Sequence, residues 1–89
     1  MRTITLKDHE ALVLFDFLQR EIETNNARRV APYFEHPAEF WALNNLFCAM
    51  EPVTGEVFRS DYGKIIDAAR TAVMHQCDPE GTFVIGGPA

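Results

Sequence analysis

Apolar residues recur at intervals of three, four and seven positions from residue 8 to about residue 24, which predicts a helix with a buried stripe. Asp8 can cap its N-terminus, and Asn25 with Asn26 predicts its end, because asparagine tolerates the left-handed conformation found there. The helix also carries apolar residues outside the stripe. It should therefore be covered on more than one side, by two other helices or by a second subunit. The stripe comprises Ala11, Leu14, Phe15, Leu18 and Ile22.

A second helix is predicted from Pro37 to about Glu51. Proline is common at the first helical position, and Glu39 would lie in the positively polarised first turn. His36 is a mediocre cap. Pro52 ends the helix, because the residue before a proline avoids helical geometry. The buried face is expected to comprise Phe40, Leu43, Leu46, Phe47 and Met50.

A third helix is predicted from Asp61 to about Gln76, with Ser60 as its cap. Its small alanines would allow close approach by a neighbouring helix. The side chains expected to be buried are Tyr62, Ile65, Ile66, Ala69, Ala72 and Val73.

The three predicted helices are joined by two connections. In the first, at residues 27–35, Tyr33 and Phe34 could anchor the chain to the core. The second, at residues 53–59, contains a turn at Thr54 and Gly55. Its apolar residues are expected to dock inward, and they are Val53, Val57 and Phe58.

Both ends of the chain carry strand-like patterns. Residues 2–6 alternate polar and apolar, and residues 77–89 comprise a turn, a short strand at 82–85 and a loose tail. The two strands could pair within one chain, with the three helices on one side. Because an isolated two-stranded ribbon is marginally stable, pairing across a dimer is the alternative. The predicted fold class is mainly α, a three-helix domain with short N- and C-terminal strands.

The length of 89 residues predicts a single domain spanning residues 1–89. Apolar residues make up 47% of the chain, which is more than a disordered segment contains, so the chain should fold. A domain of this size has a thin core, however. Such cores are commonly reinforced by disulfides, a metal ion or a partner subunit.

The net charge of −5 argues against nucleic-acid and membrane partners, because both present negative charge. Arg28 and Arg29 form the only adjacent basic pair, too little for a basic patch. Two cysteines, Cys48 and Cys77, cannot form a dense disulfide framework, and no long apolar run resembles a signal peptide or a membrane span. These features predict a cytoplasmic protein with reduced thiols.

No arrangement of residues specifies a reaction, so the protein is expected to be non-enzymatic and to hold no cofactor. The alternative is a small metal- or small-molecule-binding regulator using His36 and Glu39, with His75 as a further ligand. Di-metal helical bundles, however, repeat a Glu-x-x-His motif, whereas this chain has one reversed copy at a helix start, where capping and the helix dipole explain it.

Four residues are candidates for a homodimer interface: Val13, Phe17, Trp41 and Cys48. Val13 and Phe17 lie beside the main stripe of the first helix, and Trp41 and Cys48 lie opposite the main face of the second. Trp41 could instead fold under the first connection. The interface is preferred, because a small domain has few places to bury these side chains and two-fold dimers are the commonest oligomers.

The run Glu-Ala-Leu-Val-Leu-Phe-Asp-Phe-Leu at residues 10–18 resembles the first helix of a group of small bacterial proteins of unassigned function. The resemblance covers about residues 4–74 and includes a last helix near Ala68, Ala69 and Arg70; the tail departs from it. It implies a bacterial cytoplasmic helical module and supplies no activity. The leading hypothesis is therefore a self-associating protein-interaction or regulatory module.

Overall fold

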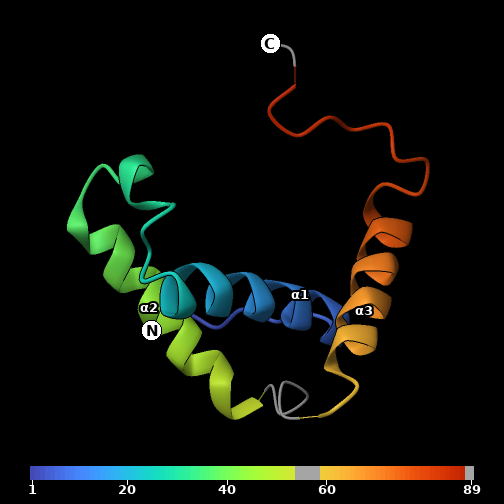
Figure 1. Cartoon of the computed structure of the whole chain (residues 1–89), viewed down its shortest axis with the longest axis horizontal. Helices are drawn as coiled ribbons and strands as arrows, with labels where there is room; N and C mark the ends of the chain where they lie inside the picture. The colour runs from blue at the N-terminus through green and yellow to red at the C-terminus, as the bar shows by residue number, and fades with distance from the viewer. Residues whose placement is uncertain (54–58, 88–89) are drawn as a thin grey trace.

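The computed structural model describes residues 1–53 and 59–87, and these residues form three α-helices. Helix α1 (Asp8–Leu18) crosses the middle of the molecule, with α2 (Pro37–Met50) packed against one side and α3 (Tyr62–Cys77) against another (Figure 1). The mainly helical class is thus confirmed. The predicted inward docking of Val57 and Phe58, and the Thr54-Gly55 turn, lie outside the described residues, as does the side chain of Val53.

Helix α1 begins where the sequence predicts, but a different residue caps it. The Glu10 carboxylate accepts a hydrogen bond from the Lys7 backbone N–H at 3.0 Å, whereas Asp8 is the first helical residue. The helix continues as a π-helical segment, η1 (Gln19–Thr24). It ends at Thr24, with Asn25 as its C-cap, and the next two residues, Asn26 and Ala27, have positive φ angles of 51° and 56°, so the asparagine stop is confirmed.

The start of α2 is also confirmed, and here His36 does cap the helix. Its Nδ1 atom accepts a hydrogen bond from the Ala38 N–H at 3.0 Å, and Pro37 occupies the first helical position. Before α2, a short 3-10 turn, η2 (Ala31–Tyr33), interrupts the first connection. After α2, Pro52 lies in a second 3-10 turn, η3 (Glu51–Val53).

Helix α3 begins slightly later than predicted, and the proposed Ser60 cap is wrong. Asp61 occupies the cap position, and its backbone carbonyl accepts hydrogen bonds from the Lys64 and Ile65 N–H groups. Its carboxylate makes no capping bond, because the Arg59 guanidinium holds both oxygens at 3.1 and 3.2 Å.

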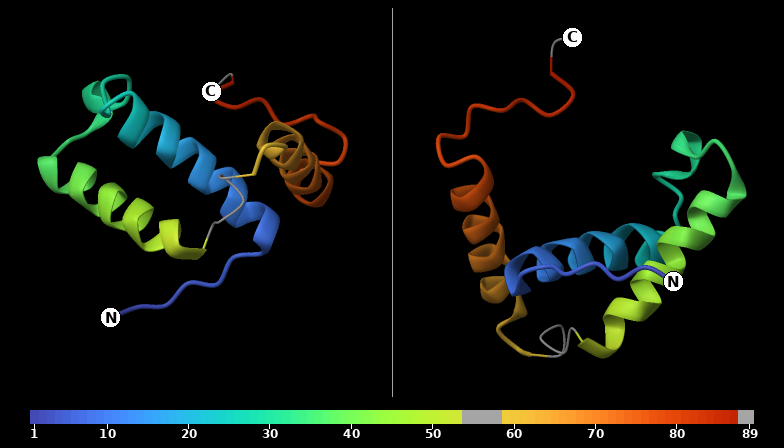
Figure 2. Two further views of the ribbon diagram at one scale, coloured as in Figure 1. Left: turned by 60° about the horizontal axis from the view of Figure 1, so that its bottom comes forward. Right: turned by 180° about the vertical axis from the view of Figure 1, so that it is seen from behind.

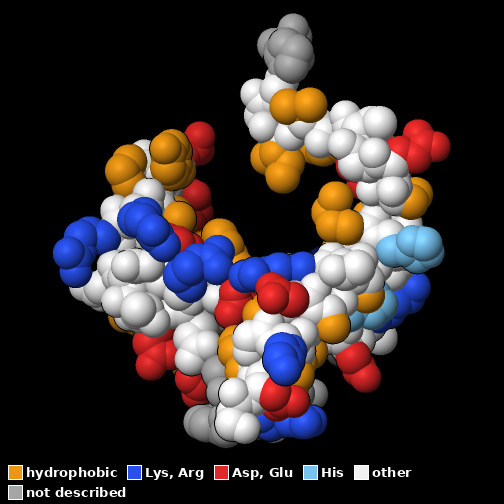
Figure 3. Space-filling view, turned by 45° about the vertical axis from the view of Figure 1, so that its right-hand side comes forward, with side chains coloured by type: hydrophobic (Ala, Val, Ile, Leu, Met, Phe, Trp, Pro, Cys, Tyr) orange, Lys and Arg blue, Asp and Glu red, His pale blue; other side chains and the backbone are white. Residues whose placement is uncertain are grey.

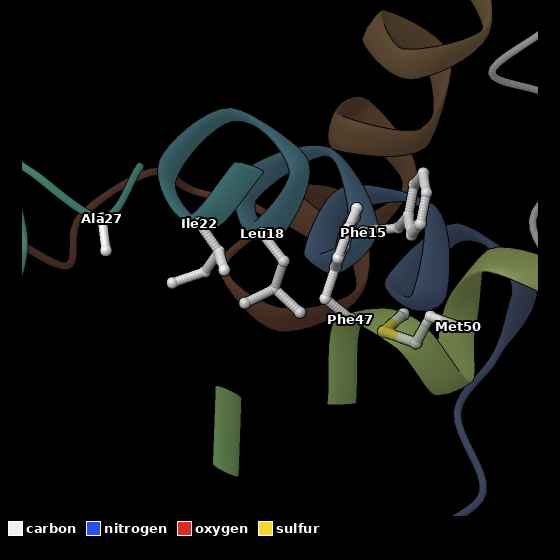
Figure 4. Close-up of a cluster of buried hydrophobic side chains, with 6 residues drawn as sticks. All are labelled: Phe15, Leu18, Ile22, Ala27, Phe47 and Met50. Atoms are coloured by element: carbon white, nitrogen blue, oxygen red, sulfur yellow. The ribbon is translucent and has the colours of Figure 1, made fainter. Parts of the chain in front are cut away.

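Among the described residues, the apolar core consists of two separate clusters that share only α1. The larger lies between α1, η1 and α2, where the Phe15 and Phe47 rings stack 5.3 Å apart, with the fully buried Leu18 beside Phe47 (Figure 4). Ile22, Ala27 and Met50 complete its buried residues, and Phe34 packs against it as predicted. Tyr33 does not, since it is 80% exposed.

The smaller cluster joins α1 to α3 and contains three buried side chains, Leu12, Ile66 and Ala69. Val13, Tyr62 and Ile65 pack around them. Because Leu12 and Leu14 point to different sides of the helix, α1 is covered twice. The wide apolar surface of α1 was explained either by two other helices or by a second subunit. The structure shows two helices of the same chain covering it.

Neither predicted terminal strand is present among the described residues. Residues 2–6 and 82–84 are exposed and form no strand, and Ile85 lies in a turn with Gly86. Figure 1 and the right-hand view of Figure 2 show the N-terminal segment near α2 and the tail leaving the far end of α3, well apart from it. The prediction of an intrachain ribbon is wrong for a physical reason. The Asp78 carboxylate accepts hydrogen bonds from the Thr82 and Phe83 N–H groups. These bonds hold the start of the tail at the end of α3, away from residues 2–6.

The molecule is more open than a compact domain of its length. Its radius of gyration is 14.5 Å, against about 12 Å for a typical 89-residue domain. Its accessible surface is 7144 Å², whereas a compact monomer of 10.1 kDa exposes about 5,300 Å². The chain therefore leaves about 1,900 Å² more surface in water than its mass requires.

Candidate interaction surfaces

An apolar groove of about 470 Å³ lies between the N-terminal segment, α1 and α2. Each element contributes two side chains, and all six are apolar. The groove is as large as many ligand pockets, but such pockets also present a few polar groups that orient the ligand. A lining without such groups is suited to apolar side chains. The lining residues are Ile4, Leu6, Ala11, Leu14, Leu46 and Met50.

A second apolar feature is the tail segment Phe83, Val84 and Ile85, which we call the apolar tail. These side chains are 76%, 64% and 91% exposed. The segment follows the predicted turn, which is confirmed: Gly81 has a φ of 64° and donates its N–H to the Asp78 carbonyl at 3.0 Å. The base of the tail is therefore ordered by Asp78, while its apolar side chains lie in water.

The four residues predicted for the interface do not form one surface. Val13 is half-buried beside the smaller cluster, facing α3. Phe17 is exposed, with the Arg20 guanidinium 5.6 Å above its ring. Trp41 and Cys48 lie on the side of α2 that faces away from α1, and Trp41 is 59% exposed. The Trp41 and Phe40 rings form a T-shaped pair with centroids 5.0 Å apart, and the exposure of Trp41 argues against its folding beneath the first connection.

Asp16 is the centre of a polar contact between α1 and α3. Its carboxylate accepts hydrogen bonds from the Tyr62 hydroxyl and the Arg70 guanidinium, both at 3.0 Å, and from Arg20 at 3.2 Å. Figure 3 shows basic and acidic side chains together on the floor of the hollow between the two arms. The hydrogen bonds from Tyr62 and Arg70 hold α3 against α1, and with Arg20 they engage both oxygens of the Asp16 carboxylate.

Among the described residues, Glu21 is the charged residue that is buried, and no pattern in the sequence indicated this. Its carboxylate pairs with Arg29 through both oxygens and with Arg20 at 3.2 Å. The hydrogen bond from Arg29 is the main reason that the pKa of Glu21 lies below its ordinary value, although desolvation acts in the opposite direction. The same contact raises the pKa of Arg29. An ionised, paired carboxylate supports structure, because a general acid must hold a proton near neutral pH.

The residues of the metal-site alternative have other roles in the structure. His36 caps α2 through Nδ1, and the Glu39 carboxylate accepts the Glu35 N–H at 3.4 Å. His75 and Cys77 are exposed near the end of α3. Within residues 1–53 and 59–87, no three His, Cys, Asp or Glu side chains are grouped closely enough to bind a metal ion.

Comparison with protein-family models, curated proteins and solved structures found no match. The resemblance of residues 10–18 to small bacterial proteins therefore stays a prediction. Across the described part of the chain, no helix has both the length and the apolarity needed to cross a membrane.

Proposed function

We propose that this protein is a non-enzymatic interaction module that associates with a second copy of itself. The observation that carries the proposal is the surface excess of about 1,900 Å² over a compact monomer of this mass. A standard specific interface buries about 800 Å² on each partner, and obligate dimers bury about 1,000–2,500 Å². The excess is therefore as large as an obligate dimer interface.

The chemistry of the exposed surface supports the same proposal. Several large apolar side chains remain in water, whereas the core formed by residues 1–52 and 59–87 comprises two small clusters. Burying apolar surface contributes about 25 cal/mol per Å², so a partner would supply stability that the thin core lacks. The most exposed among the helices and the C-terminal tail are Tyr33, Trp41, Phe83, Val84 and Ile85.

The groove favours docking over catalysis, because its lining offers no group for proton transfer or nucleophilic attack. The metal-binding alternative is disfavoured, because His36 Nδ1 and the Glu39 carboxylate already accept backbone hydrogen bonds. A bacterial, cytoplasmic setting with both thiols reduced is part of the proposal.

Sedimentation velocity between 1 and 100 μM tests self-association. We expect a concentration-dependent species of twice the 10.1 kDa chain mass, under reducing conditions that prevent disulfide links through the exposed cysteines. A single 10.1 kDa species at every concentration would contradict the proposal.

A further inference from the structure

We infer that the apolar tail of one copy, Phe83 to Ile85, docks in the apolar groove of a second copy, and that the exchange is reciprocal. The inference rests on the proposed self-association and specifies its contact. Both halves of the contact are present in every chain. A two-fold dimer therefore contains the contact twice and closes without leaving a free groove or tail.

The two surfaces match in chemistry. Three consecutive apolar side chains, mostly in water, would meet six apolar lining residues. Neither surface presents a charged side chain that would be left buried without a partner. Transfer of both surfaces from water is the ordinary driving force for such an association.

Neither segment has regular secondary structure. Residues 82–84 of the tail and the groove-bordering segment that carries Ile4 and Leu6 are irregular, and the tail turns at Ile85 and Gly86, where the Gly87 N–H donates to the Val84 carbonyl at 3.0 Å. Because Asp78 already accepts the Thr82 and Phe83 N–H groups, the contact with the groove is made by the apolar side chains of the tail and not by a ladder of backbone hydrogen bonds.

The position of the tail explains why a second copy is the occupant. Helix α3 packs on the side of α1 that carries Leu12 and Val13, whereas Ala11 and Leu14 line the groove on the other side. The Asp78 carboxylate holds the Thr82 and Phe83 N–H groups at the end of α3. The apolar tail spans about 10 Å when extended, no more than the diameter of the intervening helix. While the Asp78 contacts hold, the tail cannot pass α1 to reach its own groove.

Site-directed cross-linking tests the contact directly. In a background with Cys48 and Cys77 replaced by serine, one chain carries Leu6→Cys and a second, isotopically labelled chain carries Ile85→Cys. After mixing and mild oxidation, we expect the labelled-to-unlabelled disulfide to dominate over links between like chains. The control pairs Ile85→Cys with Thr71→Cys, an exposed position on α3, and should give little mixed product.

A tail variant separates this inference from the proposed function. Phe83→Asp with Ile85→Asp should raise the dimer dissociation constant about a hundredfold or more, with unchanged helical circular dichroism. If the wild type and this variant dimerise equally, the tail contact is refuted while self-association stands. If the wild type is monomeric, the proposed function fails as well. If a chain carrying both Leu6→Cys and Ile85→Cys closes on itself as a monomer, the tail occupies its own groove and the exchange is refuted.

Discussion

The two-cluster core predicts that α3 opens separately from the rest of the molecule. Ile22 lies in the larger cluster and Ile66 in the smaller, and each side chain is 5% exposed. They therefore allow a matched pair of substitutions, Ile22→Val and Ile66→Val, which delete the same methyl group at the same degree of burial. Only the cluster that loses the methyl group differs.

Ile-to-Val substitutions in cores typically cost about 0.5–1.5 kcal/mol. Since 1.4 kcal/mol is a factor of ten, the opening equilibrium should rise about 2- to 12-fold. Ile22 keeps its contacts when α3 alone detaches, so Ile22→Val should not change that detachment. Ile66 loses its contacts when α3 detaches and also when the whole chain unfolds.

Native-state amide hydrogen exchange measures both openings. Ile22→Val should accelerate exchange in α1 and α2 by about 2- to 12-fold and leave α3 unchanged. Ile66→Val should accelerate exchange in all three helices by a common factor. All samples need the same protein concentration, so that self-association contributes equally.

The refuting result is equally specific. If Ile22→Val accelerates α3 by the same factor as α2, the three helices open together. The two clusters would then form one cooperative unit despite their separation around α1.

Further predictions concern single contacts. At neutral pH, Glu21 stabilises the fold through its lowered pKa, and this contribution is lost as the pH falls below its ordinary value of 4.5 and through the lower folded-state value. Melting temperatures measured from pH 6 to 3 should therefore fall more steeply for the wild type than for Glu21→Gln; equal slopes would count against the Arg29 contact. His36→Ala removes the acceptor for the Ala38 N–H and should lower stability by about 0.5–1 kcal/mol in urea titration, whereas an unchanged midpoint would show that the cap contributes nothing. Leu18→Ala removes a side chain of 0% exposure and should cost about 3–5 kcal/mol, measured the same way, and a loss below about 1 kcal/mol would be inconsistent with the packing around it.

Local patterns were sufficient to predict the helices and most of their buried faces. Three features follow from the backbone preferences of individual residues and need no distant contact. They are the asparagine stop after η1, the proline start of α2 and the turn at residues 78–81. Two cap predictions failed, because neighbouring residues compete for the position. Glu10 and not Asp8 completes the α1 cap, and Asp61 and not Ser60 occupies the cap position of α3.

The groove and the buried ion pair could not be predicted from spacing. Glu21 and Arg29 are eight residues apart, and they meet only because the chain reverses at Asn26 and Ala27. Ile4 and Leu6 formed a recognisable alternating pattern, but their role beside α1 and α2 depends on where the N-terminal segment lies.

The sequence by itself determined which residues are helical and which side of each helix is apolar, because both depend on interactions within a few residues along the chain. Only the tertiary structure decided that α1 is covered by two helices on different sides, that the terminal segments remain unpaired within the described residues, and that a large surface stays exposed. These outcomes depend on the directions in which the connections leave each helix. Contacts between residues distant in sequence set those directions, and the periodicity of apolar residues does not predict such contacts.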